Sequence, residues 1–220
     1  MLEAAKSLLL ILSALFPIVN PLGGSPVFFS LTSNYSSETR RALSLRIARN
    51  SFFLLVGSYF IGTHVLAFFG ISIPVVQVGG GLVVTSTGWA MLKRRDDEDR
   101  NEVRDHAQPE DPFRQAFYPF TLPLTVGPGS ISVAITLGAN SAHLSGLNLW
   151  PLVAALGGSL LIAASIYLCY GFSDRLAQFL GPSAMTVIMR LSSFLLVCIG
   201  VQILWNGLSA LIASVPPHAH

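Results

Sequence analysis

The chain has 220 residues, of which 52% are hydrophobic and only 11% are charged. Its mean hydropathy is +0.62, whereas soluble domains carry about 25% charged residues. This composition excludes a soluble globular domain, since such a fold could not bury so much apolar surface. We therefore expect an integral membrane protein that contacts membrane lipid, with no nucleic-acid partner.

Six uncharged stretches each reach the ~20 residues that cross a bilayer core. They run over residues 7–32, 50–69, 71–92, 115–139, 149–170 and 191–213. The first is too long for a signal-peptide core and has no cleavage site of the Ala-x-Ala kind, so it is expected to be retained. The predicted fold class is all-α integral membrane with six transmembrane helices.

Basic residues are concentrated in the connections after the first, third and fifth stretches, and Lys6 is the one basic residue on the other side. Such an imbalance in short loops sets the topology of a membrane protein. The sequence therefore predicts three cytoplasmic loops and both termini outside. With no eukaryotic sorting signal visible, we expect a multi-pass protein of a bacterial inner (plasma) membrane with periplasmic termini.

An internal repeat relates the first stretch to the fourth with a constant offset of 102 residues. Four positions recur: Pro17, Pro21, Leu22 and Pro26 as Pro119, Pro123, Leu124 and Pro128. A weaker echo relates residues 80–89 to 192–201. The pattern predicts a repeat over 1–92, a charged cytoplasmic linker over 93–114 and a second repeat over 115–220. Because each unit has three spans, the copies would be inverted in the membrane; the general frequency of proline in membrane helices is the alternative.

Proline and glycine are expected to break the first and fourth helices at residues 20–26 and 123–130. Non-helical backbone at membrane depth is tolerated only inside protein or beside a wet cavity, so the two breaks predict a solute site. Free N–H groups there suit a carboxylate, and free carbonyls suit an ammonium. The alternative is that both are kinks that merely bend the helices. The candidate residues are Asn20, Pro21, Gly23, Gly24, Ser25, Thr125, Gly127, Pro128, Gly129 and Ser130, with Ser132 at the same level.

The six stretches contain no Asp or Glu, which leaves little support for proton coupling. His64 lies near the outer end of the second stretch, and Cys169 and Cys198 are interpreted as small packing residues. No metal, cofactor or catalytic group is expected. Three amide side chains inside the stretches need partners, either each other or a solute: Gln77, Gln202 and Asn206.

Several motifs resemble those of the MarC family, in family order and over essentially the whole chain. They are NPLG at 20–23, FGISIP at 69–74 before the glycines at 79–81, PLTVGPGSI at 123–131 and FLLVCIGVQ at 194–202. The resemblance implies a six-helix inner-membrane protein, grouped with neutral amino acid transporters in a superfamily of lysine-exporter type built from inverted three-helix repeats. It also implies that the site lies at residues 20–26 and 125–130. Family members vary where this chain has Gly23-Gly24-Ser25, so the substrate does not transfer.

The leading hypothesis is a secondary transporter of small neutral amino acids or similar small zwitterionic solutes, alternating access around a midplane site at the two breaks. The alternative is an efflux carrier for an unidentified metabolite or drug with no amino acid preference. A thiol-redox carrier would need cysteines at the breaks, and an enzyme would need a catalytic dyad or metal cluster at membrane depth. A channel would show flux that does not saturate. Homo-oligomerisation is left open.

Overall fold

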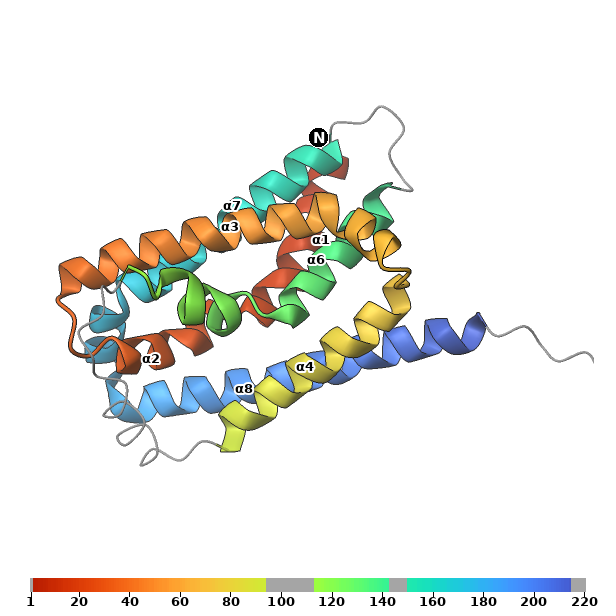
Figure 1. Ribbon diagram of the computed structural model, residues 1–220. Helices are drawn as coiled ribbons and strands as arrows, with labels where there is room; N and C mark the ends of the chain where they lie inside the picture. The colour runs from red at the N-terminus through yellow and green to blue at the C-terminus, as the bar shows by residue number, and fades with distance from the viewer. Residues whose placement is uncertain (1, 94–112, 143–149, 215–220) are drawn as a thin grey trace, which may run out of the picture.

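A computed structural model describes residues 2–93, 113–142 and 150–214, and all regular secondary structure in these ranges is helical (Figure 1). The elements are α1 (Leu2–Val19), α2 (Pro21–Leu31), α3 (Ser37–Phe68), α4 (Ile73–Lys93), η1 (Ala116–Thr125), α6 (Pro128–Ala142), α7 (Trp150–Gly171) and α8 (Ser173–Ala213). The predicted linker over 93–114 lies outside the described residues except at its two ends.

Five of these segments are long and apolar enough to cross a membrane. They are Lys6–Leu31, Ser37–Phe68, Ile73–Lys93, Leu152–Gly171 and Ser183–Ala213. A sixth crossing exists if η1 and α6, which are bent by 70° at their junction, form one broken span. The all-helical membrane class is thus confirmed. The last span begins earlier than the predicted residue 191, because Gly181, at φ 73°, divides α8 and the second part of the helix starts just after it.

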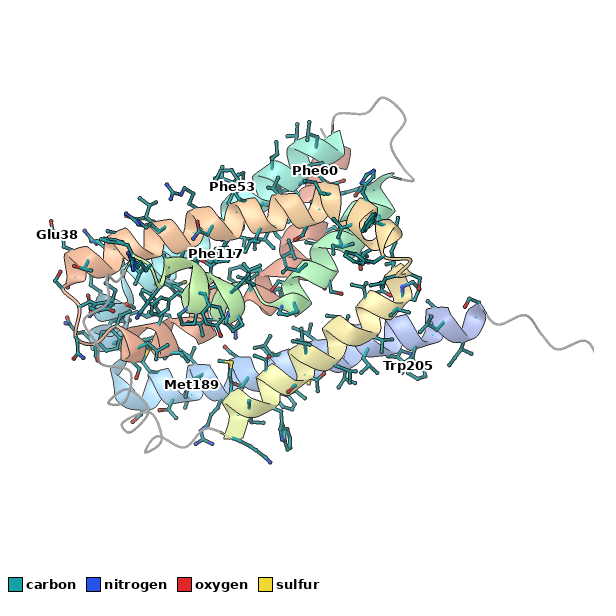
Figure 2. All side chains as sticks on the ribbon, viewed as in Figure 1. Glu38, Phe53, Phe60, Phe117, Met189 and Trp205 are labelled. Carbon is teal, nitrogen blue, oxygen red and sulfur yellow. The ribbon has the colours of Figure 1, made fainter. Side chains whose placement is uncertain are left out.

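The helices form two groups, with α4 and α8 side by side along one edge of the molecule and α1, α3, α6 and α7 packed together on the other (Figure 1). The buried apolar cluster draws on α1, α2, α3, η1, α6 and α7, and within the described residues it takes none from α4 or α8. On the outer surface, Phe53 and Trp205 point away from the bundle and are 64% and 61% exposed (Figure 2). Such faces fit contact with lipid.

Small residues hold α4 against α8 at backbone distance. A Cβ atom on Gly81 would lie 2.5 Å from the Leu204 nitrogen, and one on Gly88 would lie 2.8 Å from the Val197 nitrogen. Since lipid removes the hydrophobic force between helices, close van der Waals packing of this kind is what holds membrane helices together. The α4–α8 pair is therefore held together by close backbone packing at its glycines, and not by the buried apolar cluster of the other helices.

Arg40 organises the end of the bundle where α3 and α8 begin and α4 ends, which we call the basic face. Its side chain is buried, forms an ion pair with Asp174 of α8, and donates to the carbonyl oxygens of Thr32 at 3.0 Å and Tyr35 at 2.9 Å. Ser37 Oγ donates to the same carboxylate at 2.9 Å. In the sequence, Arg40 counts only as one of the basic residues that set the topology. In the structure its side chain also links α2, α3 and α8, and we call this set of contacts the Arg40 clamp.

Replacing Gly81 with alanine is expected to destabilise the α4–α8 pair, because the added methyl group meets the backbone of α8, which cannot move away by rotating a side chain. Overpacking typically costs about 1–3 kcal/mol. Thermal unfolding of the purified protein in detergent should show a lower midpoint for Gly81→Ala. Gly79→Ala is the matched control, since a Cβ there meets nothing within 4 Å. Equal midpoints for the two variants would contradict the packing described.

Arg40→Gln is expected to lower the free energy of unfolding by about 3 kcal/mol, because it leaves the largely buried Asp174 carboxylate without its cation. The neighbouring Arg41, which lies at the surface over the Phe172 ring, supplies the control. Loss of an exposed cation–π contact costs about 1 kcal/mol or less, so Arg41→Gln should unfold close to the wild type. Denaturant titration in detergent compares the two, and similar losses would show that the Arg40 clamp carries no special stability.

Candidate functional site

The first break is confined to a single residue, Asn20. It has φ 47° and ψ 58°, the one positive φ of a non-glycine residue in the described part of the chain. Asparagine tolerates this left-handed conformation better than most residues. Its Oδ1 accepts the Gly23 N–H at 3.1 Å and so caps α2, while Pro21 occupies the first helical position, where an N–H would have no partner within α2.

The expected break within residues 20–26 is therefore present at Asn20, and the rest of this segment is helical. Ser25 stays helical although a proline follows it, and its hydroxyl donates to the Cys169 carbonyl at 2.8 Å. Gly23 lies against Ser192 of α8, where a Cβ would come within 2.6 Å. The expectation of free N–H groups at the start of α2 is wrong for Gly23, because Asn20 accepts its amide proton.

The second break is a sharp bend at Val126 and Gly127 between η1 and α6. Tyr118 and Leu122 leave helical geometry, as expected for residues that precede prolines. Two hydroxyls stabilise the irregular turns: Thr121 Oγ1 donates to the Ala116 carbonyl at 2.6 Å, and Thr125 Oγ1 to the Phe120 carbonyl at 2.7 Å. The predicted fourth-helix break is therefore present.

The two breaks agree at one position of the proline motif and differ at another. Asn20, before Pro21, and its repeat counterpart Leu122, before Pro123, both leave helical geometry. The sharper bend at Val126 and Gly127 comes before Pro128, whose counterpart Pro26 lies inside α2. The second break therefore has a kink that corresponds to the first break and a bend that the first repeat lacks.

Both breaks open on one cavity of about 100 Å³, which we call the break cavity. Seven candidate residues line it: Asn20, Gly24, Thr125, Gly127, Pro128, Gly129 and Ser130. Pro21, Gly23 and Ser25 do not. The α4–α8 pair closes the cavity with apolar side chains and with Thr87. At ~30 Å³ per water, the cavity has room for roughly three waters. This volume is enough for the polar end of a small solute.

The break cavity is uncharged and offers hydrogen-bond donors. Gly129 and Ser130 lie in the first turn of α6, where backbone N–H groups have no partner within the helix and carry its positive dipole end. The Asn20 Nδ2 atom is buried and has no hydrogen-bond partner among the described residues. Its Oδ1 is committed to Gly23, which fixes Nδ2 as the donor. These groups can bind a carboxylate or another small acceptor without a fixed cation.

Tyr170 connects the two breaks and was not among the residues that the sequence suggested. Its ring is fully buried and stacks on Phe28 with ring centroids 4.6 Å apart. Its hydroxyl lies 3.2 Å from Thr125 Oγ1 on one side, and a Cβ on Gly24 would come within 2.5 Å of it on the other. Nothing in the sequence distinguishes this tyrosine from other aromatic residues of the spans, because its role depends on which helices surround it.

Several other polar groups find partners away from the break cavity. Ser132 Oγ donates to the Val76 carbonyl at 2.9 Å and so ties α6 to α4. Gln202 Nε2 donates to Asn206 Oδ1 at 2.9 Å within α8. His64 is exposed near the end of α3. Ser132 is thus a structural contact, and the Gln202–Asn206 pairing is one of the two outcomes expected for these amides.

Long apolar helices, an outer surface of exposed aromatic residues and a broken-helix cavity define a multi-pass membrane protein of the transporter-like class. A sequence profile described as "MarC family integral membrane protein" matches residues 5–212. The chain is 32% identical over 217 residues to proteins named inner membrane protein MarC from Escherichia coli O1:K1 and Escherichia coli K12, covering 96% of this chain and 98% of each relative. A Shigella flexneri protein of that name matches equally well. No solved structure matches. This chain belongs to the MarC family of inner-membrane proteins.

Gly24→Ala is expected to lower the unfolding midpoint, because its methyl group would push against the Tyr170 hydroxyl, whose ring is held by Phe28. Combining it with Tyr170→Phe removes the obstructing oxygen and should restore much of the lost stability. The single Tyr170→Phe variant provides the reference for the double mutant in the same thermal unfolding assay. Additive losses in the double variant would show that Gly24 and Tyr170 are not in contact.

Proposed function

We propose that this protein is a secondary transporter of small neutral amino acids or similar small zwitterionic solutes, which bind in the break cavity. The observation that carries the proposal is the meeting of two broken helices on one uncharged cavity with unpaired donors. Broken helices at the interface of two repeats are a typical substrate site in secondary transporters. In the bilayer, such irregular backbone is tolerated only where it is buried or lines a path for polar solutes.

The donors in the break cavity suit the carboxylate of such a solute. The N–H groups of Gly129 and Ser130 point along the α6 axis toward the space before its first turn, and Asn20 Nδ2 supplies a third donor. A neutral site of this kind binds a carboxylate less tightly than an arginine would. That suits a carrier, since it must release its solute on the other side.

Packing between α4 and α8 supports an inverted repeat. Gly81 lies against Gly200, and Gly88 lies against Ser193, so the two helices run antiparallel with a heptad spacing. The weaker sequence echo between 80–89 and 192–201 equates Gly81 with Ser193 and Gly88 with Gly200. When each residue is replaced by its repeat equivalent, the contact of Gly81 with Gly200 becomes the contact of Ser193 with Gly88. A two-fold axis between α4 and α8 would relate the two contacts in this way.

The remaining helices support the same symmetry. The second span contacts the fifth (α3 with α7), the first contacts the fifth (α1 with α7), and the second contacts the fourth (α3 with α6). The proposed repeat equates the first span with the fourth and the second with the fifth, so it converts the contact of α1 with α7 into the contact of α6 with α3. Because the α4–α8 pair takes no part in the apolar core of the described residues, it is suited to rock against the other helices as one body. Movement of this kind would expose the solute site to each side in turn.

Orientation follows from the basic face, which carries Arg40, Arg41, Lys93 and Arg175, whereas Lys6 lies toward the opposite end of the bundle. The positive-inside rule supports a cytoplasmic basic face and periplasmic termini. We call the end of the bundle with the start of α1 and the end of α8 the terminal face.

Counter-exchange in liposomes tests the proposed function. Purified protein should take up radiolabelled neutral amino acids saturably, and faster when unlabelled solute is inside. Asn20→Asp keeps the cap on Gly23 and the left-handed backbone but replaces the Nδ2 donor with a negative charge. Because like charges in a closed site cost several kcal/mol, exchange of carboxylate solutes should fall by at least about tenfold.

Ser25→Ala is the control, since that hydroxyl is bonded to Cys169 outside the break cavity, and it should retain exchange. Unfolding midpoints of all variants exclude loss of fold as the cause. Exchange of another metabolite but of no amino acid would favour the efflux carrier without amino acid preference. Flux that neither saturates nor counter-exchanges would contradict a carrier altogether.

A further inference from the structure

A second cavity, of about 290 Å³, lies between the α4–α8 pair and helices α1 and α6. Four polar side chains from four different helices line it: Ser13, Gln77, Thr136 and Asn206. Ile18 lines this cavity and also the break cavity. We call the second space the outer cavity. At ~30 Å³ each, roughly ten waters fill such a volume, so it is large enough for a small hydrated solute.

The four polar residues lie at one depth. At 1.5 Å per residue, they are roughly 6 to 11 Å from the terminal-face ends of their segments, which are the start of the first span at Lys6, the start of α4, and the ends of α6 and α8. Asn20 lies roughly 20 Å from Lys6 by the same measure. Thr87 and Met91, on the other side of the break cavity, are close to the basic face. The two cavities therefore follow one another across the membrane.

Polar side chains within membrane spans normally face the protein interior or a water-filled space, because lipid cannot satisfy them. The outer cavity gathers such groups from four helices and holds no charge among the residues that line it. Its chemistry differs from that of the break cavity. Ser13 and Thr136 donate their hydroxyl protons to the carbonyls of Leu10 and Ser132, at 3.0 and 2.9 Å, which leaves their oxygen lone pairs as acceptors.

A further acceptor comes from Pro17, which also lines the outer cavity. Pro21 has no N–H, so the Pro17 carbonyl lacks the helical donor that a residue four positions on would normally supply. The amide of Gln77 can add an acceptor or a donor. Asn206 presents its Nδ2 donor, because its Oδ1 accepts from Gln202. The outer cavity thus offers three acceptor oxygens, from Ser13, Thr136 and Pro17, beside two amides, whereas the break cavity offers backbone donors, and this difference suits the ammonium and the carboxylate of a zwitterion.

We propose that the outer cavity is a second binding station of the solute path, open to water at the terminal face and selective for hydrogen-bond-donating groups such as an ammonium. Ile18 is the barrier that separates it from the break cavity. The solute would pass from one station to the other when the α4–α8 pair, which lines both cavities, shifts against α1 and α6. This proposal rests on the proposed transport function for its solute, but its two structural parts are testable without any flux.

Water access is tested by cysteine labelling in vesicles with the terminal face outward, in a Cys169→Ala/Cys198→Ala background. Ser13→Cys and Asn206→Cys should react with a membrane-impermeant maleimide added outside. The matched control is Val201→Cys, on the outer surface of α8 and 52% exposed. A thiol in lipid stays protonated and away from the reagent, so it should react at least about tenfold more slowly. Equal rates at Asn206→Cys and Val201→Cys would overturn the water-filled cavity.

The barrier is tested with Ser130→Cys, whose side chain is buried and lines the break cavity but not the outer cavity. From the terminal side it should react slowly, and Ile18→Ala should raise the rate by about tenfold or more, because a cysteine that reagent can reach reacts as a thiolate. Val83→Ala, which shortens a side chain lining the break cavity alone, is the control and should leave the rate unchanged. Unfolding midpoints show that both variants remain folded. No increase with Ile18→Ala would overturn its role as the barrier.

Binding is tested by protection. The neutral amino acids that support counter-exchange, added at millimolar concentration, should slow labelling of Asn206→Cys several-fold, and the corresponding carboxylic acids without an amino group should not. Equal protection by both would overturn selectivity for donors, and exchange without any protection would overturn the second station while leaving the proposed function intact. Absence of exchange with normal water access would instead count against the proposed function alone.

Discussion

Every backbone N–H and carbonyl that the bilayer surrounds must find a partner inside the protein, and the two helix breaks satisfy this requirement by different means. Asn20 supplies a side-chain oxygen to the Gly23 N–H, so the first break needs only one non-helical residue. At the second break, the hydroxyls of Thr121 and Thr125 bond carbonyls five residues earlier, and the Val126 N–H bonds the Thr121 carbonyl at 2.8 Å. The N–H groups at the start of α6, beside the break cavity, and the buried Asn20 Nδ2 have no partner of this kind among the described residues.

Two kinds of packing hold the helices together, and each kind occurs in a different part of the molecule. Large apolar side chains and the stacked rings of Phe28 and Tyr170 join α1, α2, α3, η1, α6 and α7 into one core. The α4–α8 pair is instead joined by glycines at backbone distance, and both cavities lie where it meets α1 and α6. These glycine contacts hold α4 closely against α8, whereas the apolar cluster of the described residues takes no side chain from either helix. Relative movement is therefore expected at the boundary between the pair and the core, and not within either part.

The basic face adds a fixed point to this arrangement. Arg40 joins α2 and α3 to the start of α8 through Asp174, so α8 is anchored at that end. Beyond Gly181, whose positive φ divides the helix, the membrane-crossing part of α8 is free of that clamp. A rocking movement of the α4–α8 pair would therefore turn about the basic end of α8 and have its largest amplitude toward the terminal face, where the outer cavity lies.

By itself, the sequence determined the membrane class, the approximate spans, the family and the two broken segments, because hydropathy, charge bias and proline act locally and leave direct traces in composition. It also identified seven of the residues that line the break cavity. Only the tertiary structure decided that Ser25 and Gly23 face neighbouring helices, that Tyr170 bridges the breaks, and that Arg40 is buried against Asp174. Those outcomes depend on which helices become neighbours and at what rotation. No local pattern encodes that choice, since it is set by how all the helix faces pack together at once.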